Sequence, residues 1–394
     1  MPDTPDAATV SVLGSIHEVR AADWDACAGT DDPFLGHAFL AALEDSGSVA
    51  GETGWLPRHL ALHDAGGRLR AAMPLYLKSH SYGEYVFDWG WAEAFERAGG
   101  RYYPKLQAAV PFTPVTGRRI LLHPQAPAGA FDAMASAAVR LAEELHVSSL
   151  HVTFPTEAEC GRLSARRFLT RLGHQYHWEN RGYRCFDDFL GDLASRKRKG
   201  IRRERQEVAA SGLSVRTLTG GEIEERHWDT FWGFYQDTAG RKWGHAYLNR
   251  DFFRRLGETL ADRVVLVVAE KPSGEPVGGA LNLLGGNALY GRYWGCSDAC
   301  RYLHFEVCYY RAIDFAIERG LARVEAGAQG EHKVQRGYLP QPTWSAHWIA
   351  HGGLRNAVER FLASERPAVR AEIEALTAQA PFRRDETQPR VTLS

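Results

Sequence analysis

Apolar residues alternate with turn signals most clearly between residues 264 and 349. Residues 264–269 form an unbroken apolar run, which predicts a buried strand. Turns rich in glycine, proline and asparagine follow, and they delimit two further predicted strands at 277–284 and 288–296. This part of the pattern predicts three consecutive antiparallel strands.

The pattern then changes from strand to helix. Four apolar residues recur at helical spacing before Arg319-Gly320 ends the segment: Phe305, Cys308, Ala312 and Phe315. Residues 323–326 predict another strand, and a last strand at 343–349 follows a polar loop. The second half therefore predicts three strands, a helix, a strand, a polar loop and a strand.

The first half repeats this order. A hairpin, a helix and a strand are predicted at 59–78, 131–145 and 149–154. Between hairpin and helix, residues 82–117 interleave aromatic residues, prolines and single charges without a regular period. Such an insertion suits either a pocket wall or a cap over the sheet. Order and spacing predict two copies of one architecture, at residues 9–180 and 181–394.

Three local patterns add detail. Asp32-Pro33 predicts a helix start, because an acidic N-cap precedes proline at the first helical position. Residues 161–172 predict a helix, and residues 241–244 a basic aromatic loop. The charged face of the predicted helix is expected to be solvated rather than a ligand site; it consists of Arg162, Arg166, Arg167 and Arg171.

Composition excludes several classes of protein. The 394 residues are 44% hydrophobic and 24% charged, as in an ordinary globular protein. A formal net charge of −1 means that nucleic acid or membrane could bind only through a local patch. Without a signal pattern or a long apolar run, we expect a soluble cytoplasmic protein with no membrane insertion. Six scattered cysteines predict neither a disulfide framework nor a zinc site, and no metal is expected.

Seven stretches carry a resemblance to a known family. They are GEYVFDW at 83–89, YYPK at 102–105, VPFTP at 110–114, FDDFL at 186–190, SRKRK at 195–199, RKWG at 241–244 and HKVQRGY at 332–338. In them the chain resembles the FemAB-like predicted N-acyltransferases of peptidoglycan biosynthesis or recognition. The resemblance implies an α/β fold of tandem GNAT-like domains, as in Fem ligases, which move an aminoacyl group from tRNA onto an amine of a cell-wall precursor.

Two features depart from related enzymes. The predicted link at 296–304 contains no glycine, whereas CoA-dependent GNAT enzymes hold pyrophosphate in a glycine-rich loop at a helix N-terminus. The basic helix predicted at 195–210 is too short for the coiled-coil arm of some Fem ligases. The expected fold is therefore Fem-type without the arm, and the donor is either aminoacyl-tRNA or acyl-CoA.

Acyl transfer to an amine requires a neutral amine, a polarised carbonyl and a route for the proton. Glu325, on the strand after the central helix, could hold the amine, although glutamate is usually exposed. Glu306 could also be catalytic, but the helix dipole by itself favours an acid in the first turn. Tyr338 is the candidate proton donor.

Further residues are candidates for substrate binding. His332, Lys333 and Arg336 place three donors within five residues, which suits a phosphate or carboxylate as well as a solvated loop. The other candidates are Asp88, Trp89, Tyr103, Lys105, Arg241, Lys242, Trp243, Tyr293 and Gln329.

Residues 196–205 contain seven basic residues and one acidic residue. This helix could bind phosphate on tRNA or on a lipid-linked precursor, or it could be a solvated surface helix. The candidate phosphate ligands are Arg196, Lys197, Lys199, Arg202 and Arg203.

These observations favour an N-acyltransferase that moves an acyl or aminoacyl group onto an amine of a peptide or cell-wall-related acceptor. Two alternatives stay open. One is an acetyl-CoA-dependent N-acetyltransferase of a small amine. The other is a non-catalytic module that recognises peptides or wall precursors.

Overall fold

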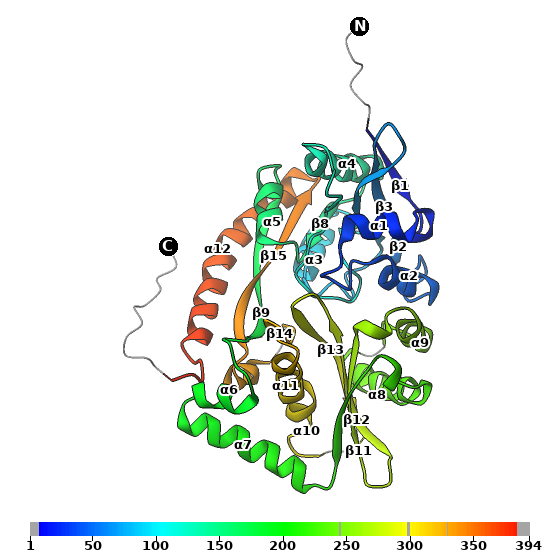
Figure 1. Ribbon diagram of the computed structural model, residues 1–394. Helices are drawn as coiled ribbons and strands as arrows, with labels where there is room; N and C mark the ends of the chain where they lie inside the picture. Colours follow the sequence, from blue (N-terminus) through cyan, green and yellow to red (C-terminus); the bar gives the residue numbers. More distant parts are fainter. Residues whose placement is uncertain (1–7, 244–245, 298–299, 329, 384–394) are drawn as a thin grey trace.

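The computed structural model describes residues 8–243, 246–297, 300–328 and 330–383, and of residues 242 and 243 it describes only the backbone. The strands are β1 Thr9–Leu13, β2 Trp55–Pro57, β3 His59–His63, β4 Leu69–Met73, β5 Leu75–Lys78, β6 Lys105–Ala108, β7 Leu121–Leu122, β8 Ser149–Thr153, β9 Leu169–Glu179, β10 Ser214–Thr219, β11 Val264–Glu270, β12 Pro276–Leu284, β13 Ala288–Cys296, β14 Arg323–Glu325 and β15 Leu339–Ile349. They form a four-stranded sheet, β1-β3-β4-β7, and an eleven-stranded sheet, β10-β11-β12-β13-β14-β9-β15-β8-β6-β5-β2 (Figure 1).

The helices cover these sheets. The α-helices are α1 Ala21–Ala28, α2 His37–Asp45, α3 Trp89–Arg97, α4 Ala130–Glu144, α5 Glu157–Ser164, α6 Phe186–Asp192, α7 Ser195–Ala210, α8 Glu225–Trp243, α9 Arg250–Thr259, α10 Leu303–Phe305, α11 Arg311–Glu318 and α12 Gly352–Thr377. Short 3-10 or π segments are η1 Ile16–Glu18, η2 Gly220–Glu222, η3 Ala261–Arg263, η4 Glu306–Tyr310 and η5 Glu331–Arg336. No helix in the described part of the chain is both long enough and apolar enough to cross a membrane.

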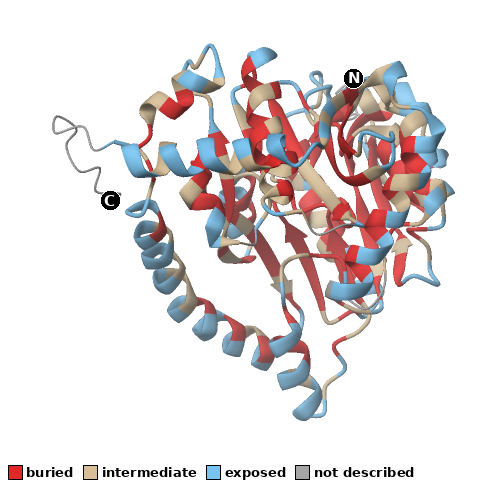
Figure 2. Ribbon diagram, turned by 90° about the horizontal axis from the view of Figure 1, so that it is seen from below, coloured by how far each residue is buried: buried red, intermediate tan, exposed pale blue. Residues whose placement is uncertain are grey.

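Strand β11 shows why its apolar run is continuous. Alternate side chains of a strand point to opposite faces of the sheet. Val264 and Leu266 lie in one core cluster with Phe231 of α8, whereas Val267 lies in another with Val307 of η4. The sheet is therefore buried between helices on both faces, and Figure 2 shows its strands as the buried centre of the molecule.

The two halves are built alike. In the first half, β6 pairs antiparallel with β5 and parallel with β8. In the second half, β13 pairs antiparallel with β12 and parallel with β14. α4 packs against β8, and α11 packs against β14, in corresponding places. The predicted repetition of strand pair, helix and parallel strand is present.

The two halves exchange their last strands. β9, from the first half, lies between β14 and β15, and β15, from the second half, lies between β9 and β8. β9 and β15, which are 11 residues each, pair antiparallel at the centre of the large sheet. The large sheet therefore continues without interruption across the boundary expected near residue 180.

Several local predictions were wrong. Residues 169–172 belong to β9 rather than to a helix, because pairing with β15 buries Leu169 and Leu172. The helix expected from Pro33 begins at His37, after a turn. Residues 241–243 continue α8 instead of forming a loop. For β9, tertiary pairing outweighs the local signal.

Candidate active site

A bulge and a splay create a cavity between β13 and β14. Leu281 of β12 pairs with Tyr293 and Asn282 pairs with Gly291, so Arg292 is the extra residue of β13. A bulge of this kind bends its strand and interrupts pairing. β13 pairs with β14 only from Ala288 to Tyr290, and its remaining residues diverge from β14. The cavity at the divergence measures about 490 Å³.

Residues from both halves line the cavity. The first half supplies Tyr85, Phe87 and Pro114. The second half supplies Tyr235, Thr238, Ala280, Leu281, Asn282, Gly291, Arg292, Tyr293, Trp294, His304, Cys308, Tyr309, Ala326, Gly327, Ala328, Gly330, His332 and Lys333. The cavity is therefore a junction between the halves, and its aromatic and aliphatic wall carries a few polar groups, as small-molecule sites usually do.

Two polar atoms of this wall lack hydrogen-bond partners. Asn282 is 1% exposed and Thr238 is 8% exposed. The Nδ2 group of Asn282 donates to the carbonyl of Val265 at 3.2 Å. Its Oδ1 atom accepts no hydrogen bond from any described group, and Oγ1 of Thr238 also has no hydrogen-bond partner among them. Because a buried polar group without a partner is costly, these atoms are suited to a ligand that donates hydrogen bonds.

A π-helical turn supplies a tyrosine–histidine pair. η4 is a π-helix, a rare form that is often found at functional sites. Its Tyr309 hydroxyl lies 3.1 Å from Nε2 of His332. Burial raises the pKa of Tyr309, which keeps the hydroxyl protonated at neutral pH. The pair can therefore pass a proton to or from a reacting group in the cavity.

Aromatic rings and a lysine complete this end of the cavity. The ring centroid of His304 lies 4.8 Å from that of Trp294 and 5.2 Å from that of Tyr309. Nζ of Lys333 donates to the carbonyl of Ala326 at 2.5 Å and so holds the segment after β14. These contacts order the wall in which His332 lies.

The three predicted catalytic residues lie around the cavity but not in its lining. Glu306 accepts from Arg205 of α7 at 3.1 Å. The Tyr338 hydroxyl is fully buried and donates to the carbonyl of Tyr309 at 3.1 Å. Oε1 of Glu325 is 2.8 Å from Nε of Arg323.

The other carboxylate oxygen of Glu325 differs from the first. Oε2 of Glu325 lies 3.6 Å from Nε2 of His177, and neither atom has a hydrogen-bond partner within the described residues. Glu325 directly precedes the lining residue Ala326. Of the three acidic or phenolic candidates, Glu325 is the one with an oxygen that makes no hydrogen bond within the described residues.

The predicted substrate-binding residues fall into separate groups. Tyr293, His332 and Lys333 lie in the cavity wall. Arg336 instead pairs with Glu204 of α7 at 2.8 Å. Arg241 pairs with Asp237 on α8. Gln329 and the side chains of Lys242 and Trp243 lie outside the described residues.

Four other candidates lie in the first half. Lys105 is fully buried, with Nζ 2.7 Å from Glu84 and 2.5 Å from Asp88. Burial raises the pKa of Glu84 to about 7, against the opposing charge of Lys105. The Tyr103 hydroxyl bonds to Ser81, whereas Trp89 is 41% exposed. None of these candidates is among the residues that line the cavity.

The basic helix α7 presents most of its predicted phosphate ligands to solvent. Arg196, Lys199, Arg202 and Arg203 are exposed, and Lys197 is half-buried against Gln335. Arg202 pairs with Asp187 at 3.0 Å and Arg203 pairs with Glu207 at 2.8 Å, which leaves Arg196 and Lys199 without an ion pair among described residues.

The candidates predicted from the sequence did not include the polar residues Asn282, Thr238 and Tyr309 of the cavity wall. Asn282 was visible as the one polar residue of the apolar segment 277–284, which is a usable signal. Thr238 and Tyr309 lie on helices without any distinguishing local pattern, so only the fold brings them to the cavity. Among the residues that the structure describes, no three His, Cys, Asp or Glu side chains come together as a metal site would require.

Solved structures show which fold this is. FemX aligns with a TM-score of 0.56 at 12% identity, covering 89% of this chain and 100% of its own. The C-terminal domain of a putative lysylphosphatidylglycerol synthetase from Agrobacterium fabrum aligns with a TM-score of 0.53 at 10% identity, covering 89% and 97%. L-PGS from Bacillus licheniformis aligns with a TM-score of 0.51 at 9% identity, covering 90% of this chain and 98% of its own. At these identities the likeness concerns the fold, and it confirms the expected tandem GNAT-like, Fem-type architecture.

Sequence comparison gives the family. No curated protein matches the chain. The profile of the FemAB-like family, described as peptidoglycan biosynthesis/recognition, matches residues 15–384. That match spans nearly the whole chain, and the chain belongs to the FemAB-like family.

Proposed function

We propose that this protein is an N-acyltransferase that moves an aminoacyl or acyl group onto an amine of a peptide or cell-wall-related acceptor. The family match and the likeness to FemX support a peptidoglycan-related transferase. The observation that carries the proposal is the unpartnered Oδ1 of Asn282, in the same cavity as the Tyr309–His332 pair.

The chemistry follows from these groups. Asn282 Oδ1 and Thr238 Oγ1 would accept hydrogen bonds from the acceptor amine and so orient its lone pair. The amine nitrogen forms a bond to the donor carbonyl carbon, and the bond from that carbon to the leaving oxygen or sulfur breaks. The amine loses a proton and the leaving group gains one, and the Tyr309–His332 pair is positioned to carry it.

Aminoacyl-tRNA is the donor that the family resemblance implies, and the exposed Arg196 and Lys199 of α7 would contact its phosphates. Acyl-CoA is the competing donor. Glu325 is retained as a candidate to hold the amine, because its Oε2 atom has no hydrogen-bond partner among the described residues.

The test is a transfer assay with the purified full-length chain. A mixture of aminoacyl-tRNAs, or acetyl-CoA in a parallel reaction, is offered with amine-bearing muropeptides, and the products are analysed by mass spectrometry. We expect an amide product, reduced about tenfold or more in kcat/KM by Asn282→Leu, since one hydrogen bond to a charged or developing-charge group is lost. Binding of acceptor with no product from any donor would leave a recognition module instead.

A further inference from the structure

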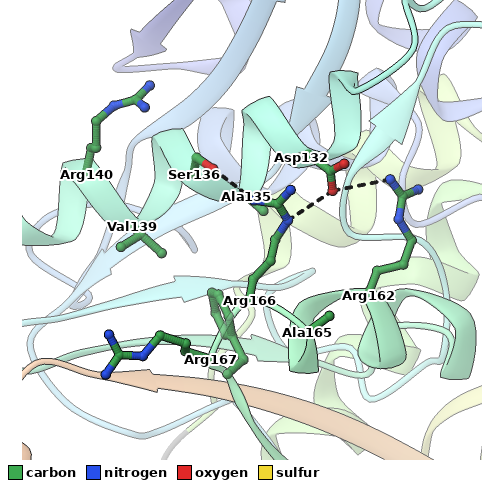
Figure 3. Close-up of a pocket in the computed structure, with 10 residues that line it drawn as sticks. Asp132, Ala135, Ser136, Val139, Arg140, Arg162, Ala165, Arg166 and Arg167 are labelled. Atoms are coloured by element: carbon green, nitrogen blue, oxygen red, sulfur yellow. Dashed lines mark hydrogen bonds and ion pairs between the residues drawn. The ribbon is translucent and has the colours of Figure 1, made fainter.

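A second cavity lies in the first half, between α4 and the end of α5. It measures about 770 Å³ and shares no lining residue with the cavity between β13 and β14. Its apolar lining, called the floor below, consists of the buried Ala135 and Phe168, the half-buried Val139 and the exposed Ala165. Figure 3 shows the polar residues around this floor.

The groove is strongly positive. Four arginines line it, Arg140, Arg162, Arg166 and Arg167, and Asp132 is the one acidic residue among the lining. Four positive charges less one negative charge leave a local excess of three, in a chain whose formal net charge is −1. A concentrated local field of this kind attracts anions.

Two of the arginines are held in place by the groove itself. Nε of Arg166 donates to Asp132 at 3.0 Å and its Nη1 donates to Ser136 at 3.2 Å. The guanidinium of Arg162 lies 3.7 Å from the ring centroid of Phe131 and also donates to Asp132. These contacts fix two guanidinium groups beside the floor.

The other two arginines have no such partners. Neither Arg140 nor Arg167 makes a side-chain hydrogen bond or ion pair with any residue the structure describes, and Figure 3 shows both side chains away from Asp132. Arg140 lies outside the last turn of α4, so the helix dipole does not account for it. The backbone of Arg167 is fixed, because its carbonyl accepts from Arg355 at 2.6 Å.

We propose that this groove is an anion site that binds a phosphate group, with Arg140 and Arg167 as its ligands and Arg166 beside them. The planar guanidinium fork matches phosphate oxygens two at a time. The side chains of Arg140 and Arg167 are exposed and point in different directions in Figure 3, so they would turn toward the floor to hold one phosphate or diphosphate. The apolar floor accommodates the part of the ligand next to the phosphate. The ligand is either a free phosphorylated molecule or a phospholipid headgroup.

The experiment uses the full-length protein and two probes. Inorganic pyrophosphate is titrated by calorimetry, and vesicles of phosphatidylcholine with or without phosphatidic acid are tested by co-sedimentation. The double variant Arg140→Ala/Arg167→Ala should weaken binding about hundredfold, since each charge-assisted contact is worth about tenfold. Arg370→Ala, which removes an exposed arginine of α12, is the matched control and should bind like the wild type.

A gain of affinity provides a test that misfolding cannot imitate. Asp132→Asn removes the acidic group of the groove but keeps an oxygen for Arg166, so it should bind the anion several-fold more tightly. If the wild type binds pyrophosphate and the double variant does not, the ligand is a free phosphorylated molecule. If the wild type binds only the vesicles and the double variant does not, the ligand is a phospholipid headgroup. Absence of binding to both probes, or equal binding by wild type and double variant, overturns the proposal. The outcome is independent of acyl transfer.

Discussion

Tyr309 and His332 come from different elements, η4 and η5, and meet in the cavity wall with 3.1 Å between the tyrosine hydroxyl and the imidazole Nε2. Tyr309→Phe keeps the ring and removes the hydroxyl. If the pair carries the proton, kcat should fall about hundredfold with little change in KM, in keeping with the usual size of acid–base catalysis.

Tyr183→Phe is the matched control, because it removes a hydroxyl that donates to Asp192 away from the cavity. Steady-state kinetics of the two variants separates the possibilities. A raised KM with unchanged kcat in Tyr309→Phe would assign the hydroxyl to binding rather than to proton transfer.

At the scale of an element, the two faces of α7 differ in their contacts. Its inner face is attached to η4, η5 and α11. Glu204 bonds to Tyr310 and to Arg336, whereas Arg205 bonds to Glu306 and to Asp314. Its outer face carries the exposed lysines and arginines. Two of the predicted site residues, Glu306 and Arg336, therefore attach the basic helix to η4 and η5.

This arrangement predicts unequal effects of two variants on one helix. Glu204→Ala leaves Arg336, whose side chain is 9% exposed, without its carboxylate, and should lower the free energy of unfolding by about 3 kcal/mol. Arg203→Ala breaks a solvent-exposed pair with Glu207 and should leave stability nearly unchanged. Urea unfolding measures both, and equal effects would show that the inner clamp adds nothing.

At the scale of the whole molecule, the two halves are joined by exchanged strands and by a buried histidine pair. His151 of β8 and His347 of β15 are register partners, with 2.6 Å between their Nδ1 atoms. Burial lowers the pKa of His151 to about 3, assisted by the charge of Lys105 and opposed by Asp88. Burial, His151 and Arg171 also lower the pKa of His347.

The consequence is acid sensitivity. The unfolded chain takes up protons on these histidines near their usual pKa of about 6.5, whereas folded His151 does so only near pH 3. Stability is therefore full above pH 6.5 and decreases as the pH falls from 6.5 toward about 3. His347→Asn keeps a hydrogen-bonding group beside His151 without titrating, so its free energy of unfolding should fall less steeply in this range. An unchanged slope in urea titrations at several pH values would contradict this account.

The sequence by itself determined the order of elements in the second half, the repetition of that order in the first half, and the family. These follow from local patterns, since an apolar run of six residues such as 264–269 of β11 can bury both of its faces only inside a sheet. The sequence also marked Tyr293, His332 and Lys333, which lie in the cavity wall.

Only the tertiary structure decided which strands are neighbours and which polar groups meet. β9 is a strand because β15 pairs with it from 160 residues or more further along the chain, and local propensity contains no information about that partner. Packing of α8 and η4 against β12 and β13 brings Asn282, Thr238 and Tyr309 to one cavity. Ion pairs from α7 to η4 and η5 hold Glu306 and Arg336 against that helix. Side-chain partners at a site depend on contacts between distant segments, and one-dimensional patterns do not specify them.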